Sequence, residues 1–159
     1  MEKIPLTQKG YDALNEELKR LKSVERPAII EAIAIARAHG DLSENAEYSA
    51  AKEQQSFIEG RIMELESVIS LADVIDHTAF TGNVVKFGAT VKIVDEETDN
   101  EETYMIVGHY EADFEKGKLS IQAPVSRALI GKSVGDSVEV RSPKGKRTYE
   151  ILEVHFRDN

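Results

Sequence analysis

Two long runs with helical periodicity, joined by a short polar stretch, constrain the fold of this chain more than any other feature. In the second run, the steps between apolar positions alternate between four and three, as they do in a coiled coil. These positions are Ala51, Gln55, Ile58, Ile62, Leu65, Ile69 and Ala72. Because the joining stretch is short, the two helices must fold back on each other as an antiparallel hairpin.

The first run predicts one helix from about residue 8 to residue 38, with Thr7 as its N-cap. Pro27 lacks a backbone donor and predicts a kink in this helix. The second helix is expected to begin near Ser43 or Glu44. About thirty residues in each arm give a rod of roughly 45–50 Å. The apolar face of the first arm is expected at Tyr11, Leu14, Leu18, Leu21, Ile29, Ile30 and Ile33.

Beyond residue 72 the chain changes to short alternating or β-branched runs that are separated by turn signals. After a linker over residues 73–82, strands are expected at 83–87, 90–95, 103–107, 118–121, 137–141 and 148–154. One short helix is expected at 125–130. The predicted fold class is therefore α+β, with a coiled-coil hairpin over residues 1–76 and a small, mostly antiparallel β domain over residues 77–159.

The charge and the residue content of the chain restrict its chemistry. It carries 20 Lys and Arg against 29 Asp and Glu, a formal net charge of −9, so its overall field does not steer it onto nucleic acid. If it acts near RNA or DNA, another protein must bring it there. It has no Cys, which excludes disulfides and thiolate zinc sites. With no long apolar segment and no export signal, it is expected in the cytoplasm.

The joining stretch contains Asp41 and Glu44, three residues apart and directly after Gly40. If the pair opens the second helix, this spacing brings both carboxylates near one face. Two carboxylates suit Mg²⁺, which usually takes its other ligands from water or phosphate, so a partner would have to complete the site. Spacing alone favours the plainer interpretation, which is a solvated acidic turn.

Three residues on the arms flank this acidic stretch. Arg37 and Lys52 either pair with nearby Glu side chains or contact phosphates of a nucleic-acid strand. Tyr48 either packs within the hairpin or stacks on a base. Packing is favoured for Tyr48, because the turn of a hairpin needs an apolar plug.

Several segments of the sequence resemble the Gre family of bacterial transcript-cleavage factors. The most specific are the tip, GDLSENAEY, and a later segment, SRALIGKSVGD. The stretches SAAKEQQ, GRIMELE and the closing YEILEV also fit, so the resemblance covers nearly the whole chain in order. Because few basic residues lie near the tip on the first arm, the chain is more similar to the GreA branch than to the GreB branch.

The resemblance implies that the coiled coil enters the secondary channel of RNA polymerase. There, Asp41 and Glu44 match the family's acidic pair, which helps to hold a second Mg²⁺ and its attacking water. The polymerase then cleaves its own backtracked transcript and restarts from a new RNA 3′ end. The protein would thus be an accessory factor and not an enzyme, with Mg²⁺ held jointly with the polymerase and none bound tightly to the free protein.

The resemblance also assigns contacts. The second domain is expected to be FKBP-like and to dock on the polymerase near the channel entrance, and the protein is expected to be a monomer without a membrane partner. Contacts with RNA or polymerase near the tip are expected from Arg37, Asn45, Tyr48 and Lys52. Docking is expected from Pro124, Val125, Ser126 and Arg127.

Three other functions stay open at this point. A relative class with the same architecture inhibits the polymerase through a tip with a different acidic set, whereas this chain keeps the cleavage-factor spacing of Asp41 and Glu44. An FKBP-like domain could be a peptidyl-prolyl isomerase or chaperone, but aromatic residues are only 6% of the chain and Trp is absent. A structural coiled-coil adaptor would have an inert tip.

Overall fold

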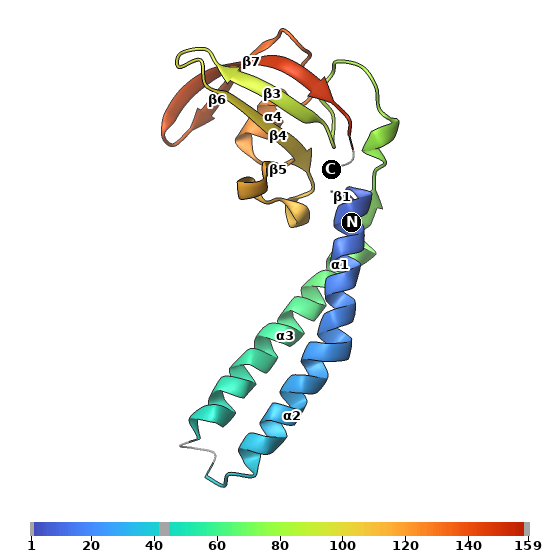
Figure 1. Ribbon diagram of the computed structural model, residues 1–159, viewed down its shortest axis with the longest axis vertical. Helices are drawn as coiled ribbons and strands as arrows, with labels where there is room; N and C mark the ends of the chain where they lie inside the picture. Colours follow the sequence, from blue (N-terminus) through green and yellow to red (C-terminus); the bar gives the residue numbers. More distant parts are fainter. Residues whose placement is uncertain (1, 42–44, 158–159) are drawn as a thin grey trace. The chain divides into compact units, whose positions relative to one another are not determined.

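The computed structural model describes residues 2–41 and 45–157 (Figure 1). The chain forms two compact units, one containing residues 11–72 with residues 1–2, and the other containing residues 3–10 and 73–159. The domain boundary expected between residues 76 and 77 stays a prediction. Within the described residues, no helix is long and apolar enough to cross a membrane.

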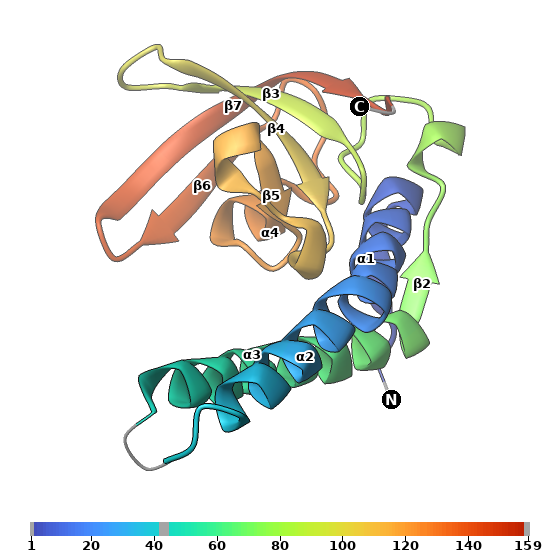
Figure 2. The same cartoon turned by 60° about the horizontal axis from the view of Figure 1, so that its bottom comes forward.

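The first unit is a helical hairpin. Its first arm consists of α1 (Gln8–Arg20), a π-helical turn (Leu21–Glu25) and α2 (Arg26–Arg37). Its second arm is α3 (Ala46–Ser70), which lies beside α2 in both views (Figures 1 and 2). The 25 residues of α3 span about 37 Å, which is shorter than the rod expected from thirty residues per arm.

The interruption expected at Pro27 takes the form of a π-helical turn. The backbone N–H of Arg26 donates to the carbonyl of Leu21, five residues earlier, where an α-helix would use the fourth. Pro27 follows directly in the first turn of α2, where its missing donor costs least. The first arm therefore stays helical throughout, as predicted, with its side-chain phase shifted at this turn.

The predicted apolar seam is largely confirmed, with two corrections. Ile30 is 53% exposed, because after the π-helical turn the seam continues through Ile29 and Ile33. Near the end of α3, Val68 is buried in place of the expected Ile69. Each large side chain in such a seam contributes about 1.5–3 kcal/mol. The buried seam residues are Leu14, Leu21, Ile29, Ile33, Ala36, Ala51, Ile58, Ile62, Leu65 and Val68.

Two bidentate ion pairs fix the register of the arms. Arg26 donates to both carboxylate oxygens of Glu59 at 2.8 Å, and Arg61 donates to both oxygens of Glu17 at 2.7 and 2.8 Å. The hydrogen bonds from Arg61 hold the pKa of Glu17 below its ordinary value. Both pairs join residues of opposite arms, so they oppose a slip of one helix along the other.

The second unit is built on a five-stranded sheet with the strand order β5-β4-β3-β7-β6. Its strands are β3 (Thr90–Asp95), β4 (Glu101–Val107), β5 (Lys118–Ser120), β6 (Ser137–Ser142) and β7 (Gly145–His155). All neighbours are antiparallel except β4 and β5, which are parallel. The short helix α4 (Pro124–Leu129) packs Leu129 into the core with Val91, Ile93, Ile106 and Ile151. The predicted α+β class is confirmed.

The strand expected at residues 83–87 is not formed, which corrects that prediction. In this segment Val84 makes an isolated bridge with Ser133, and the backbone N–H of Val85 donates to the carbonyl of Lys132. The segment thus uses its apolar side chains to fill the core without joining the sheet. Conversely, β1 (Ile4–Leu6) and β2 (Ala72–Val74) form a two-stranded sheet that the sequence did not predict.

The start of α1 is held inside the second unit. Thr7 caps the helix as predicted, since its hydroxyl accepts from the backbone N–H of Gly10 at 3.0 Å. The carboxylate of Glu111 accepts from the backbone N–H groups of Thr7 at 2.9 Å and Gly108 at 3.1 Å, and from the Thr7 hydroxyl. A Cβ at position 10 would lie 2.2 Å from Glu111 Oε1, so this contact requires Gly10.

Candidate functional site

The candidate site is the tip of the helical hairpin. The last helical residue of the first arm is Arg37, and Ala38 and His39 turn the chain toward Gly40. Gly40 has a φ of +102°, a conformation that other residues rarely adopt, although a Cβ there would meet nothing within 4 Å. Asp41 follows and is exposed. Gly40 is therefore needed for the turn that presents Asp41 beyond the end of α2.

The other half of the predicted acidic pair, Glu44, lies outside the described residues, as does Ser43. The helix start expected at Ser43 or Glu44 is wrong, because α3 begins at Ala46 with Asn45 as its N-cap. Asp41 and Glu44 both precede this helix. Asp41 is therefore not part of α3, and the expectation that a helical turn brings the pair to one face involves Glu44, which lies outside the described residues.

The side chain of Asn45 caps α3 and also forms a hydrogen bond with the end of α2. Its Oδ1 accepts from the backbone N–H of Tyr48 at 3.1 Å, and its Nδ2 donates to the carbonyl of Ala36 at 2.7 Å. Helix ends leave such N–H and C=O groups without partners inside the helix. The sequence offers several capping residues in this stretch, and its local pattern does not reveal the contact of Asn45 with the first arm.

Two further contacts cross the tip. The guanidinium of Arg37 lies over the ring of Tyr48, 5.9 Å from its centroid. His39 Nδ1 lies 3.4 Å from a carboxylate oxygen of Glu47, and both side chains are largely exposed. Arg37 and Tyr48, expected as contacts for RNA, are thus brought together by the fold itself. This agrees with the packing interpretation of Tyr48 and supplies Arg37 with an aromatic partner in place of a Glu.

Lys52 lies further along α3 and does not join these contacts across the tip. Its ammonium group donates to Gln55 Oε1 at 3.1 Å on the same helix. The side chain is exposed. Of the four residues expected near the tip, Arg37, Asn45 and Tyr48 therefore form one contact network, while Lys52 stands apart from it.

The donor set at the tip fits part of a magnesium site. Asp41 supplies an exposed carboxylate, the oxygen ligand that Mg²⁺ prefers. Among the described residues, no group of three or more His, Cys, Asp or Glu is arranged to hold a metal ion. Since Mg²⁺ is commonly held by one or two carboxylates together with phosphate or water, this tip fits the ion as a contributor of ligands to a shared site.

The expected docking segment forms the first turn of α4, and its four residues differ in exposure. Pro124 and Arg127 are exposed, and Val125 is half-buried against the core. Ser126 is fully buried, and its hydroxyl has no hydrogen-bond partner in the part of the chain that the structure describes. The Ser126 side chain therefore packs inside the unit and does not offer a surface to a partner. The docking role of the other three stays a prediction.

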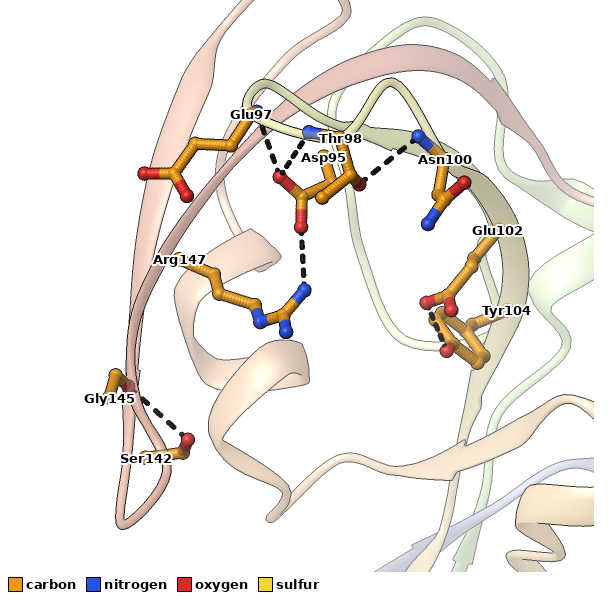
Figure 3. Close-up of polar contacts among 9 residues, drawn as sticks. All are labelled: Asp95, Glu97, Thr98, Asn100, Glu102, Tyr104, Ser142, Gly145 and Arg147. Atoms are coloured by element: carbon orange, nitrogen blue, oxygen red, sulfur yellow. Dashed lines mark hydrogen bonds and ion pairs between the residues drawn. The ribbon is translucent and has the colours of Figure 1, made fainter.

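A polar cluster occupies the sheet near the β3–β4 turn (Figure 3). Asp95 accepts from the backbone N–H groups of Glu97 at 2.9 Å and Thr98 at 3.4 Å, and pairs with Arg147 at 2.8 Å. These bonds, first that from the Glu97 N–H and then that from Arg147, lower the pKa of Asp95. Tyr104, on β4, donates its hydroxyl to Glu102. The ring of Tyr104 also stacks on that of Phe114, with 5.9 Å between the ring centroids.

Comparison with known proteins gives the family. Residues 4–74 match the family described as "Transcription elongation factor, N-terminal", and residues 80–156 match "Transcription elongation factor, GreA/GreB, C-term". The transcription elongation factor GreA of Jannaschia sp. (strain CCS1) is 67% identical over 98% of this chain and 99% of its own length. That of Ruegeria pomeroyi is 65% identical over the same shares of the two chains.

Among solved structures, the GreA factor homolog 1 (Gfh1) protein of Thermus thermophilus is 27% identical, with a TM-score of 0.45 over 97% of this chain and 99% of that one. The two family matches together cover most of the sequence, and the identity to the relatives extends over nearly its full length. The chain belongs to the GreA/GreB family of transcription elongation factors.

Proposed function

We propose that this protein stimulates RNA polymerase to cleave backtracked RNA, with the hairpin tip reaching the polymerase active site through the secondary channel. The observation that carries the proposal is the exposed carboxylate of Asp41, presented beyond the end of α2 by the turn at Gly40. A charged group in this position contributes little to folding. An exposed carboxylate at this position of the GDLSENAEY segment is explained if Asp41 acts inside a partner protein.

The chemistry is divided between the two proteins. Asp41 and Glu44 would hold Mg²⁺ together with ligands from the polymerase and the RNA phosphate, and the ion would supply activation of the attacking water. The long helical arms would carry the carboxylates through the channel to the polymerase active site, which a compact protein is too wide to reach. The polymerase remains the enzyme, and this protein is the accessory factor that completes its hydrolytic site.

The second unit would provide affinity. Arg127 is exposed on the short helix α4, and Pro124 at the start of that helix fixes the backbone of the segment. A preordered surface loses little conformational entropy on binding. Docking through this surface would raise the local concentration of the tip at the channel, which matters because the acidic chain is not attracted to nucleic acid by its own charge.

A cleavage assay tests the proposal. RNA polymerase is stalled on a template so that it backtracks, with the transcript labelled at its 5′ end, and shortening of the RNA is followed with and without the protein at fixed Mg²⁺. We expect faster shortening and recovery of elongation after nucleotides are added. A protein that slows both cleavage and elongation would instead be a channel-binding inhibitor. No effect on either process would contradict both functions.

A further inference from the structure

We propose that Asn45 is a positioning residue, which ties the end of α2 to the start of α3 and thereby holds the two arms in register at the tip that presents Asp41. This inference rests on the proposed cleavage function. It assigns to Asn45 a role within the hairpin, in place of the direct contact with RNA or polymerase expected from the resemblance.

The geometry of the Asn45 amide carries the inference. One side chain accepts from Tyr48 N–H and donates to the Ala36 carbonyl, at 3.1 and 2.7 Å. Ala36 is 2% exposed, so its carbonyl is attached to a fixed residue of the seam. The amide therefore fixes the start of α3 relative to the end of the first arm.

The chemistry of the amide explains why this residue type is required. A primary amide presents a donor and an acceptor from one planar group. A serine can accept from the helix as an N-cap, but its single hydroxyl cannot reach both Tyr48 N–H and the Ala36 carbonyl. An aspartate also caps well but has no donor for Ala36. Substituting Asn45 by serine or aspartate therefore keeps the N-cap of α3 and removes the hydrogen bond to the first arm.

The contacts beside Asn45 point in the same direction. Arg37 on the ring of Tyr48 and His39 beside Glu47 also join the last turn of α2 to the first turn of α3. These two contacts are more exposed and lack the paired hydrogen bonds of Asn45. Loss of the amide would remove the paired hydrogen bonds that join the last turn of α2 to the start of α3, on either side of the tip that contains Asp41. A displacement of about 1 Å in a catalytic geometry can cost about 100-fold in rate.

The test compares Asn45→Ser with the parent and with the control Ser56→Ala, an exposed substitution further along α3. Cleavage in backtracked complexes is measured over a range of factor concentrations. We expect Asn45→Ser to lower the rate at saturation at least tenfold, while the half-saturating concentration and the helical circular dichroism signal stay at the parent values. Asn45→Asp should behave like Asn45→Ser. Ser56→Ala should match the parent in every measurement.

A second measurement does not depend on activity. The chain has no Cys, so cysteines introduced at the exposed positions Ala38 and Ser49 can be spin-labelled specifically, and the distance distribution between them measured in the free protein. We expect a narrow distribution in the parent and a broader one in Asn45→Ser. If the parent protein failed to stimulate cleavage, the proposed function would fall while the distances still tested the link across the tip.

Three results would overturn the inference. Asn45→Ser could cleave at the parent rate, which would show that the link does not matter. Its half-saturating concentration could rise with an intact rate at saturation, which would make Asn45 a polymerase contact. Its rate could fall while the distance distribution stays narrow, which would make Asn45 a direct contact of RNA or of the reacting site.

Discussion

Asp41 and Asp95 are both aspartates near the end of a regular element, and the fold uses them in opposite ways. Asp95 ends β3, is 4% exposed, and has its oxygens occupied by two backbone N–H groups and Arg147 (Figure 3). Asp41 lies beyond the end of α2 and is exposed. Burial of a charge is costly unless it is paired and hydrogen-bonded, so Asp95 is a residue of the fold. Because Asp41 is exposed, we expect its substitution to change the free energy of unfolding little.

The largest expected effect is on the tip. Asp41→Asn keeps the size of the side chain and removes its charge, so the water that attacks the RNA should be activated far less effectively. We expect cleavage by backtracked complexes to slow by orders of magnitude at saturating factor. The free energy of unfolding should change by no more than about 0.5 kcal/mol. The control is Glu53→Gln, which removes an exposed carboxylate from α3 away from the tip and should cleave like the parent. A parent rate in Asp41→Asn would remove this residue from the chemistry.

Glu111 extends the comparison to a carboxylate that joins distant parts of the chain. Glu111→Ala leaves the N–H groups of Thr7 and Gly108 without their acceptor, which should lower the free energy of unfolding by about 1–3 kcal/mol. Denaturant unfolding measures this loss, and hydrogen exchange of the two amides should accelerate. Glu115→Ala, an exposed substitution in a neighbouring turn, provides the control. Unchanged exchange at Thr7 and Gly108 would contradict the role of Glu111.

The same division between exposed and buried groups applies within α4. Arg127 is exposed and Ser126 is fully buried, although they are neighbours in the expected docking segment. Arg127→Glu should raise the half-saturating concentration for cleavage several-fold and leave the rate at saturation nearly intact, because in the proposed function this surface would act on binding and the tip on the reaction. Lys144→Glu reverses an equal charge in the β6–β7 turn and is the control. A half-saturating concentration equal to the parent's would exclude Arg127 from the interface.

Local patterns predicted most of the fold. The alternating steps of α3 identified Ile58, Ile62 and Leu65 as buried, and the expected strand at residues 90–95 has the bounds of β3. These features depend on neighbours in the sequence, where period and turn signals are informative. Helix and strand periods could not show that Glu111 binds Thr7, because 104 residues separate them.

The candidate site was less predictable in its geometry than in its residues. Residue type and spacing singled out Asp41, the family resemblance gave it a role, and the helix start was misplaced because Ser43 and Asn45 are both good capping residues. Asn45 also donates to the carbonyl of Ala36, nine residues away on the other arm, and no local pattern predicts this contact. In the same way, the sequence of the docking segment did not reveal that Ser126 faces the core. Packing between elements decided both outcomes.

The smallest expected effect returns to Asp95. Its folded-state pKa is lowered, so its ionised form adds stability above the ordinary value of 3.8, and this contribution is lost as the pH falls through the lower folded-state pKa. Asp95→Asn keeps an acceptor for Glu97 N–H and Thr98 N–H but loses the charge that pairs with Arg147. Its melting temperature should therefore lie below that of the parent near pH 6, and the difference should shrink as the pH is lowered below about 4. Thermal unfolding across this range measures the difference, with Glu97→Gln in the same turn as the control.

Because Arg147 is 64% exposed, solvent screens its ion pair with Asp95, and the difference in melting temperature at pH 6 should be modest. Cleavage at saturation should match the parent, and a large loss of cleavage in a stably folded Asp95→Asn variant would mean that this cluster also serves the polymerase complex.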